Sequence, residues 1–170
     1  YYPGPGLGGH CIPIDPFYLT WKAKEMGVNT RFIELAGEIN SAMPSYVVSK
    51  VTDALNTVEK SISGSKILIL GLAYKKNIDD VRESPSLELI DLLVQKGARV
   101  DYSDPFISET HKTRKNDFNM KSVSLTKSVL NTFDLILLVT DHDDFDYTLI
   151  EKESKLIVDT RGKFKVSNKV

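Results

Sequence analysis

The run Lys66-Ile67-Leu68-Ile69-Leu70-Gly71 decides the fold class of this chain. A short apolar run that ends in glycine is typical of a buried strand of a parallel sheet. The amphipathic segment 84–96 follows, with Ser84 as a predicted N-cap, Pro85 as the first helical residue and Gly97 as the stop signal. Strand, loop and helix in this order predict one βα unit.

The same alternation continues toward the C-terminus. Further strands are predicted at residues 99–104, 135–139 and 156–159, a weak one at 120–124, and short helices at 125–131 and 145–152. This order predicts an α/β fold, a Rossmann-like doubly wound parallel sheet with helices on both faces. Such sheets bind ligands at the carboxyl ends of their strands. Three predicted loops start there: residues 71–83, 104–107 and 160–163.

The N-terminal loop, residues 3–16, holds the only cysteine of the chain, Cys11. Four glycines and two prolines stand just before that cysteine. Neither a helix nor a strand tolerates this density, so the segment is predicted to be a shaped loop. Gly8 and its glycine neighbour leave room for a ligand beside the backbone amides.

Two helices are predicted after this loop. Asp15, followed by proline, predicts an N-cap and a helix through Met26, with apolar residues that cover a core. A thiol just before a helix N-terminus is favoured as thiolate, and Asp15 lies four residues beyond Cys11, so its carboxylate could also orient a water there. Residues 31–58 form a long helical pattern in which Pro44 predicts a kink or two successive helices. A helix of this length is a core helix, a spine between domains or a subunit interface.

Composition excludes several classes of function. The formal net charge of the 170 residues is −1, which gives no basic field for nucleic acid. No apolar run is long enough to span a membrane, and one cysteine with three histidines is a poor zinc-binding set. A lone cysteine suits a reducing cytosol. Because the chain lacks an initiator methionine and opens inside a functional-looking loop, we expect it to be part of a longer protein.

The loop 71–84 carries the first candidate binding residues. It lacks G-x-G-x-x-G, and Lys76 stands where the third glycine would pack helix on strand, so no standard dinucleotide site is predicted. Lys75, Lys76 and Arg82 around a helix start suit phosphate oxygens. Tyr74 could stack on a base or a ribose. The alternative is that these are solvated loop charges, which is the favoured interpretation for Lys76.

Arg161 directly follows the last predicted strand, where a guanidinium suits bidentate phosphate binding. Its alternative is a surface salt bridge. His10 adjoins Cys11, but neighbouring loop residues usually point apart, so a protease-like Cys–His dyad is disfavoured. His111 and His142 have polar neighbours and are predicted at the surface.

Three motifs carry a family resemblance: Gly6-Leu7-Gly8-Gly9-His10-Cys11-Ile12-Pro13-Ile14-Asp15-Pro16, Gly71-Leu72-Ala73-Tyr74-Lys75-Lys76-Asn77 with Asp80-Val81-Arg82-Glu83-Ser84-Pro85, and Asp159-Thr160-Arg161-Gly162. They resemble the UDP-glucose/GDP-mannose dehydrogenase family of NAD-dependent nucleotide-sugar 6-dehydrogenases. The form GGHCIPIDPFYL is most similar to the branch that acts on UDP-N-acetylhexosamines, the UDP-N-acetylglucosamine 6-dehydrogenases.

The resemblance implies a division of the chain. Residues 1–60 would end a helical central domain, with the catalytic cysteine loop and a long dimerisation helix at 31–58. Residues 61–170 would form the C-terminal UDP-sugar-binding domain. NAD would be bound mainly by an N-terminal domain outside this chain, so the chain alone is expected to be inactive. The expected partners are a UDP-sugar and a second copy of the chain, with no nucleic acid, membrane or metal.

The implied reaction is the cytoplasmic oxidation of the C6 alcohol of a UDP-N-acetylhexosamine to the uronate, for surface polysaccharide biosynthesis. Cys11 would form a thiohemiacetal and then a thioester, which water assisted by Asp15 would hydrolyse. Five residues are implied to contact ligands: Gly8 the sugar, Tyr74 and Lys75 the nucleotide and its phosphates, Arg161 the UDP moiety, and Arg82 the cofactor pyrophosphate. The alternatives are a UDP-glucose or UDP-N-acetylmannosamine dehydrogenase of the same family, or a nucleotide-binding module without chemistry.

Overall fold

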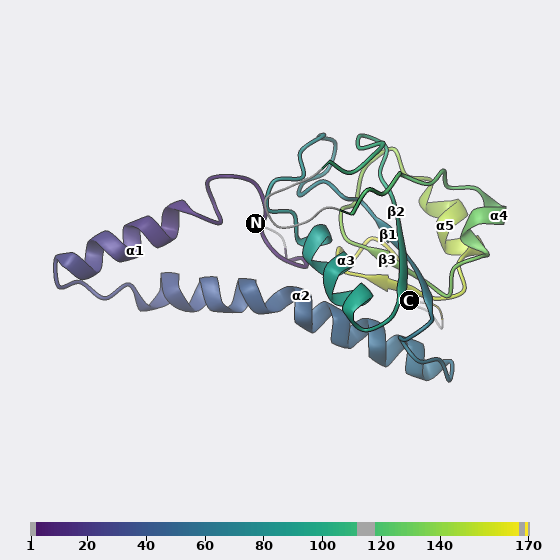
Figure 1. The fold of residues 1–170 in the computed structure, drawn as a ribbon, viewed down its shortest axis with the longest axis horizontal. Helices are drawn as coiled ribbons and strands as arrows, with labels where there is room; N and C mark the ends of the chain where they lie inside the picture. Colours follow the sequence, from purple (N-terminus) through teal and green to yellow (C-terminus); the bar gives the residue numbers. More distant parts are fainter. Residues whose placement is uncertain (1–2, 112–117, 167–168, 170) are drawn as a thin grey trace.

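The computed structural model of the protein describes residues 3–111, 118–166 and 169. In these residues four strands form one parallel sheet in the order β2-β1-β3-β4 (Figure 1). The strands are β1 (Lys66–Leu70), β2 (Arg99–Ser103), β3 (Leu135–Leu138) and β4 (Ile157–Asp159). The strand order reverses between β1 and β3, and ligands of doubly wound sheets bind at such a switch point. The predicted Rossmann-like α/β sheet is confirmed.

The strands end level at one edge of the sheet. Leu70, the last residue of β1, pairs with Ser103 of β2 and with Leu138 of β3. Leu138 pairs in turn with Asp159, the last residue of β4. The loops that follow the four strands therefore leave the sheet side by side, and they place their side chains at one common edge.

Helices cover both faces of the sheet (Figure 1). One face carries α3 and part of α2, and the other carries α4 and α5: α2 (Arg31–Thr57), α3 (Pro85–Gln95), α4 (Lys127–Leu130) and α5 (Tyr147–Glu153). Ile67 and Ile69 of β1 pack into the first core, whereas Leu68 and Leu70 pack into the second. This alternation follows from the period of two in a strand, and it explains why β1 is apolar throughout.

The long helix α2 is a single element of 27 residues that contains Pro44. Of the two predicted effects of Pro44, a kink or two successive helices, the second is therefore wrong. The C-terminal half of α2 buries Val47, Val51 and Leu55 against the sheet domain. The N-terminal half projects away from the sheet and packs against α1 (Asp15–Glu25) (Figure 1).

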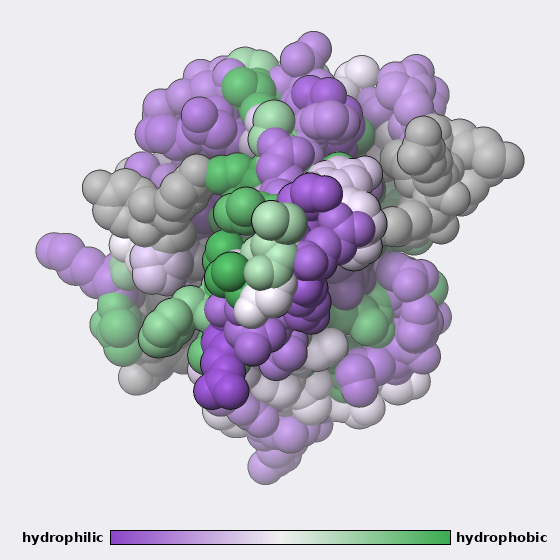
Figure 2. Space-filling model, turned by 90° about the vertical axis from the view of Figure 1, so that its left-hand side faces the viewer, coloured by the Kyte–Doolittle hydropathy of each residue, from purple (hydrophilic) through white to green (hydrophobic). Residues whose placement is uncertain are grey.

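The apolar side chains of the α1–α2 hairpin are largely exposed. Trp21 is 61% exposed, Met26 74% and Phe32 89%. The prediction that α1 covers a core is therefore wrong for this chain, since α1 packs on α2 and leaves these apolar side chains largely exposed. Figure 2 looks onto this end of the molecule and shows a hydrophobic strip beside polar side chains.

The predicted strand at 120–124 is also wrong. The described part of this region forms one isolated antiparallel bridge, between Glu109 and Lys121. The predicted N-cap of α3 is confirmed, because the Ser84 hydroxyl accepts a hydrogen bond from the Ser86 amide. No helix of the described ranges has the length and apolar character needed to cross a membrane.

Candidate functional site

The loop between β1 and α3, residues 71–84, turns closely over the neighbouring strand. Gly71 has φ +87°, and a Cβ atom there would lie 2.5 Å from the Thr140 carbonyl oxygen. Only glycine fits this close approach. The Thr140 hydroxyl donates to the Ala73 carbonyl at 2.7 Å and fixes the loop further on. The loop therefore starts from a rigid base at the carboxyl edge.

The cysteine loop, residues 3–16, lies directly on the loop 71–84. The Gly9 amide donates to the Arg82 carbonyl at 2.8 Å. A Cβ on Gly8 would lie 2.4 Å from the Tyr74 Cβ, and one on Gly9 would lie 3.0 Å from the Tyr74 ring. The two glycines thus allow the backbone to rest against the aromatic side chain. Gly8 and Tyr74, which are 66 positions apart in the sequence, meet in the structure.

Cys11 is exposed on the turn that leads into α1. Its carbonyl accepts hydrogen bonds from the amides of Ile14, at 3.1 Å, and Asp15, at 2.8 Å. Asp15 is the first residue of α1, and Ile14 is the N-cap without a side-chain hydrogen bond. The prediction of Asp15 as N-cap is therefore wrong, because the Cys11 carbonyl takes the amide hydrogen bonds of this turn. The exposed Asp15 carboxylate lies one helical turn beyond the cysteine.

Arg82 is exposed and anchored by one carboxylate. Its Nε donates to both Asp80 oxygens at 3.0 Å, and its Nη2 donates to Oδ2 at 2.6 Å. The Asp80 hydrogen bonds and charge raise the pKa of Arg82, and Tyr74 and Cys11 add smaller contributions in the same direction. The guanidinium is therefore fixed on Asp80, while the Arg82 carbonyl accepts the Gly9 amide of the cysteine loop.

Arg161 lies inside the carboxyl edge. Its Nε donates to the Val139 carbonyl at 2.6 Å, and its Nη1 would lie 2.6 Å from a Cβ on Gly4. Only 18% of its side chain is exposed, and the nearest Asp141 oxygen is 4.0 Å away. Burial lowers the pKa of Arg161, and the charges of Asp141 and Asp159 oppose that shift. The guanidinium lies between the cysteine loop and the sheet, and its long ion pair with Asp141 is mostly shielded from solvent.

The two lysines of loop 71–84 differ in their surroundings. Lys76 pairs with Asp143 at 3.0 Å, which makes it a surface ion pair away from the cysteine loop. Lys75 is exposed, and it forms no ion pair within residues 3–111, 118–166 and 169. Lys75 is therefore the lysine whose charge is available to a ligand.

A buried carboxylate, Asp104, organises this edge, although the sequence analysis did not single it out. It accepts five hydrogen bonds from groups of three segments: the amides of Leu72, Ala73, Phe106 and Ile107, and His142 Nε2. Burial alone would raise the pKa of Asp104, but the bonds from His142 and the amides outweigh burial and lower it. An aspartate at the carboxyl end of a predicted strand was the available signal.

His142 is fully buried, so its predicted surface position is wrong. Its ring lies between those of Phe106 and Phe145, with centroids 5.1 and 5.4 Å away. Nδ1 accepts the Asn77 amide at 2.9 Å, and Nε2 lies 3.0 Å from Asp104 Oδ2. His111 is exposed, as predicted.

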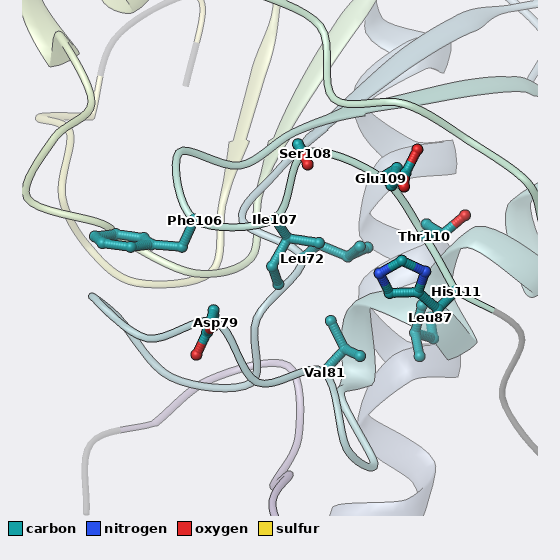
Figure 3. A pocket seen from close by; sticks show the side chains of 10 residues that line it. All are labelled: Leu72, Asp79, Val81, Leu87, Phe106, Ile107, Ser108, Glu109, Thr110 and His111. Carbon is teal, nitrogen blue, oxygen red and sulfur yellow. The ribbon is translucent and has the colours of Figure 1, made fainter.

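A small cavity of about 160 Å³ lies between the loop 71–84 and the segment after β2 (Figure 3). Apolar side chains such as Leu72, Val81 and Ile107 line it, with His111 at one end and Phe106 at the other. None of the predicted site residues lines this cavity. It is therefore a neighbour of the candidate site and not part of it.

The parallel sheet and its switch point define an α/β protein of the doubly wound class, and the cationic groups at its carboxyl edge suit anionic ligands. Two family models match the chain. The UDP-binding domain of the UDP-glucose/GDP-mannose dehydrogenase family matches residues 68–166, and the central domain of the same family matches residues 1–42.

Relatives of known name agree with these models. The chain is 36% identical over 168 residues to a UDP-N-acetyl-D-mannosamine dehydrogenase of Methanococcus vannielii, covering 94% of this chain and 36% of that protein. It is 33% identical to an NDP-N-acetyl-D-galactosaminuronic acid dehydrogenase of Ralstonia nicotianae, covering 94% of this chain and 36% of that one. The solved UDP-D-ManNAc dehydrogenase of Pyrococcus horikoshii superposes with a TM-score of 0.78 at 31% identity, covering 98% of this chain and 38% of that one.

The chain belongs to the UDP-glucose/GDP-mannose dehydrogenase family. The resemblance seen in the sequence motifs is thereby confirmed. The chain spans about a third of the length of the curated relatives it matches, since it covers 36% of each of the two named above.

Proposed function

We propose that this chain is the C-terminal part of an NAD-dependent nucleotide-sugar 6-dehydrogenase that oxidises a UDP-N-acetylhexosamine to the uronate. One observation carries the proposal. The loop that bears the lone Cys11 rests on the loop 71–84, through the Gly9–Arg82 hydrogen bond of 2.8 Å and the Gly8–Tyr74 contact. A reactive thiol and a cationic sheet edge therefore border one space. The names of the relatives support an N-acetylhexosamine as the sugar.

Substrate binding is assigned to groups at this edge. The Lys75 ammonium and the Arg161 guanidinium supply positive charge for the two phosphates, and the Tyr74 ring supplies a stacking surface. Gly8 lets the cysteine loop rest on Tyr74, because a side chain there would clash with the Tyr74 Cβ, and its backbone is proposed to border the sugar. A nucleotide held there by its phosphates would direct its sugar toward Cys11.

Cys11 acts as the nucleophile in this proposal. Oxidation of the C6 alcohol to the aldehyde removes a hydride, and the Cys11 thiolate then adds to the aldehyde carbon and forms a thiohemiacetal. Loss of a second hydride together with the hydroxyl proton converts the thiohemiacetal to a thioester, and the proton passes to water. Water, oriented by the Asp15 carboxylate, adds to the thioester and releases the uronate and the free thiolate. The covalent bond also retains the aldehyde between the two oxidations.

NAD supplies the acceptor for both hydrides. The residue of this chain proposed to reach it is Arg82, whose exposed guanidinium is fixed by Asp80 and whose carbonyl binds the Gly9 amide of the cysteine loop. A rigidly held, exposed guanidinium next to the cysteine loop fits an anionic pyrophosphate group. The remaining contacts to NAD are assigned to a domain outside residues 1–170, because loop 71–84 lacks the glycine fingerprint.

We divide the chain at residue 60, with the catalytic loop and the long helix in residues 1–60 and UDP binding in residues 61–170. A second copy is proposed to cover the helix at 31–58, which is supported by the exposed Trp21 and Phe32 side chains of the hairpin. An unpaired exposed thiol suits the reducing cytoplasm, where the uronate would serve surface polysaccharide biosynthesis.

The test measures NADH release by the complete protein against UDP-N-acetylglucosamine, UDP-N-acetylmannosamine, UDP-N-acetylgalactosamine, UDP-glucose and GDP-mannose. We expect turnover with a UDP-N-acetylhexosamine and loss of uronate formation in Cys11→Ser. Turnover with UDP-glucose and with none of the other sugars would reject the N-acetylhexosamine as substrate in favour of UDP-glucose. Undiminished uronate production by Cys11→Ser would contradict the covalent role of the thiol. UDP binding without any NADH release would favour the module without chemistry.

A further inference from the structure

We propose that Asp104 and His142 are positioning residues that clamp both ends of the segment Tyr74–Lys76. The clamp rests on the proposed function, in which Tyr74 and Lys75 hold the nucleotide. The two clamp residues make their side-chain hydrogen bonds to residues outside the cysteine loop. They act on the ligand through the backbone they hold.

The contacts place the two anchors on either side of the segment. Asp104 Oδ2 accepts the amides of Leu72 at 2.6 Å and Ala73 at 3.0 Å, immediately before Tyr74. His142 Nδ1 accepts the amide of Asn77 at 2.9 Å, immediately after Lys76. The bond of 3.0 Å between Asp104 Oδ2 and His142 Nε2 joins the two anchors. A continuous hydrogen-bonded bridge therefore spans the three residues.

The bridge fixes the chemical state of the imidazole. Nδ1 accepts a backbone N–H, so the proton of the neutral ring is on Nε2, from which it is donated to Asp104. The ring is fully buried between Phe106 and Phe145, which holds its plane. One tautomer in one orientation satisfies both partners.

The two ends of the segment are not equally secured. At its start the Ser84 and Thr140 hydroxyls donate to the carbonyls of Leu72 and Ala73, each at 2.7 Å, in addition to the Asp104 contacts. At its end the backbone of Asn77 is held by His142.

Asn77 adopts a left-handed conformation, with φ +62°. Its side chain donates to Asp143 Oδ2 at 2.6 Å and accepts the Asp143 amide at 3.0 Å. This conformation is uncommon outside glycine and needs support from its surroundings. The imidazole bond to the Asn77 amide supplies part of that support.

A Tyr74–Lys76 segment that is ordered before the ligand arrives affects UDP binding more than the chemical step. A ligand that meets an ordered loop does not have to order it on binding. Cys11 is held by the Gly9–Arg82 bond, which does not involve the clamp. Loss of the His142 anchor should therefore weaken UDP binding and, in the complete enzyme, raise KM with little change in kcat.

Two matched variants test the clamp in the full chain. In His142→Asn the Oδ1 atom can replace Nδ1 as acceptor for the Asn77 amide. In His142→Gln the amide nitrogen can still donate to Asp104, but the acceptor next to Cγ is lost. The core variant Ile150→Ala controls for loss of stability, since Ile150 is fully buried in the second core and leaves the His142 hydrogen bonds in place.

The measurements are the hydrogen-exchange rate of the Asn77 amide without ligand and the Kd for UDP, both well below the melting temperature. We expect His142→Gln to accelerate exchange and weaken UDP binding by about fivefold to tenfold, the size of one lost hydrogen bond. His142→Asn should stay nearer to wild type in both, and Ile150→Ala should change only the melting temperature.

Equal behaviour of the asparagine and glutamine variants would overturn the clamp, as would weakened UDP binding in Ile150→Ala. Failure of the wild-type chain to bind UDP would reject the proposed nucleotide site instead. The exchange rates would then still decide whether His142 holds the segment.

Discussion

Replacement of Asp104 by asparagine should destabilise the domain strongly, because both carboxylate oxygens accept several donors. Oδ1 accepts the amides of Phe106 at 2.8 Å and Ile107 at 3.1 Å. Oδ2 accepts the amides of Leu72 and Ala73, and the Nε2–H of His142. An asparagine side chain has one oxygen and one NH₂ group. In either orientation of this amide, the NH₂ group would face at least two N–H donors that the carboxylate oxygen had accepted.

The magnitude follows from the lost bonds. A hydrogen bond to a charged group contributes about 1.5–3 kcal/mol, so the loss of two predicts about 3–6 kcal/mol. This is a large part of the about 5–15 kcal/mol that stabilises a typical domain. For a chain of this size the melting temperature should fall by about 10 °C.

Urea unfolding followed by circular dichroism measures this loss. The matched control is Asp143→Asn, which makes the same change on an exposed carboxylate bonded to Lys76 and Asn77. Its unfolding midpoint should stay close to wild type, since exposed ion pairs contribute little. An Asp104→Asn variant within about 1 kcal/mol of wild type would refute the central role of this carboxylate.

Three further predictions concern the cysteine loop, pH and assembly. Gly8→Ala should separate this loop from Tyr74, since the new Cβ would lie 2.4 Å from the Tyr74 Cβ, and amide exchange at Gly9 should accelerate; unchanged exchange would contradict the contact. Because the pKa of Asp104 is lowered in the fold, its stabilisation is complete above the unfolded pKa of about 3.9 and is lost as pH falls through the lower folded value. Below about pH 4 the free energy of unfolding should therefore depend less steeply on pH in Asp104→Asn than in wild type. Identical slopes would contradict this role of Asp104. The chain should sediment as a dimer that Phe32→Asp converts to a monomer without changing the melting temperature of the sheet domain, whereas a wild-type monomer would not support the proposed interface.

Local patterns in the sequence were sufficient for much of the sheet domain. β1 and α3 were predicted because an apolar run, a serine cap and a proline lie together in the sequence. The effect of Pro44 was harder to predict. Proline removes one backbone hydrogen bond, but this loss does not reveal whether the packed helix around it continues. The exposed face of α1 shows a different limit. Apolar spacing identifies the face but not what covers it.

Long-range contacts explain the remaining differences. His142 has acidic neighbours in the sequence, yet its partners Asn77 and Asp104 are 65 and 38 positions away. Only the assembled sheet brings these loops together and buries the imidazole ring. The sequence identified Tyr74 and Gly8 separately as candidate residues, but their contact depends on the same tertiary fold.

The central claim is that the cysteine loop and the sheet edge form one nucleotide-sugar site. Cys11 is the only cysteine, so the rate of its alkylation by iodoacetamide reports on this site alone. The claim predicts that a saturating UDP-N-acetylhexosamine slows alkylation of the wild-type chain, and that Lys75→Ala loses most of this protection. An alkylation rate that UDP-sugar leaves unchanged in the wild-type chain would contradict it.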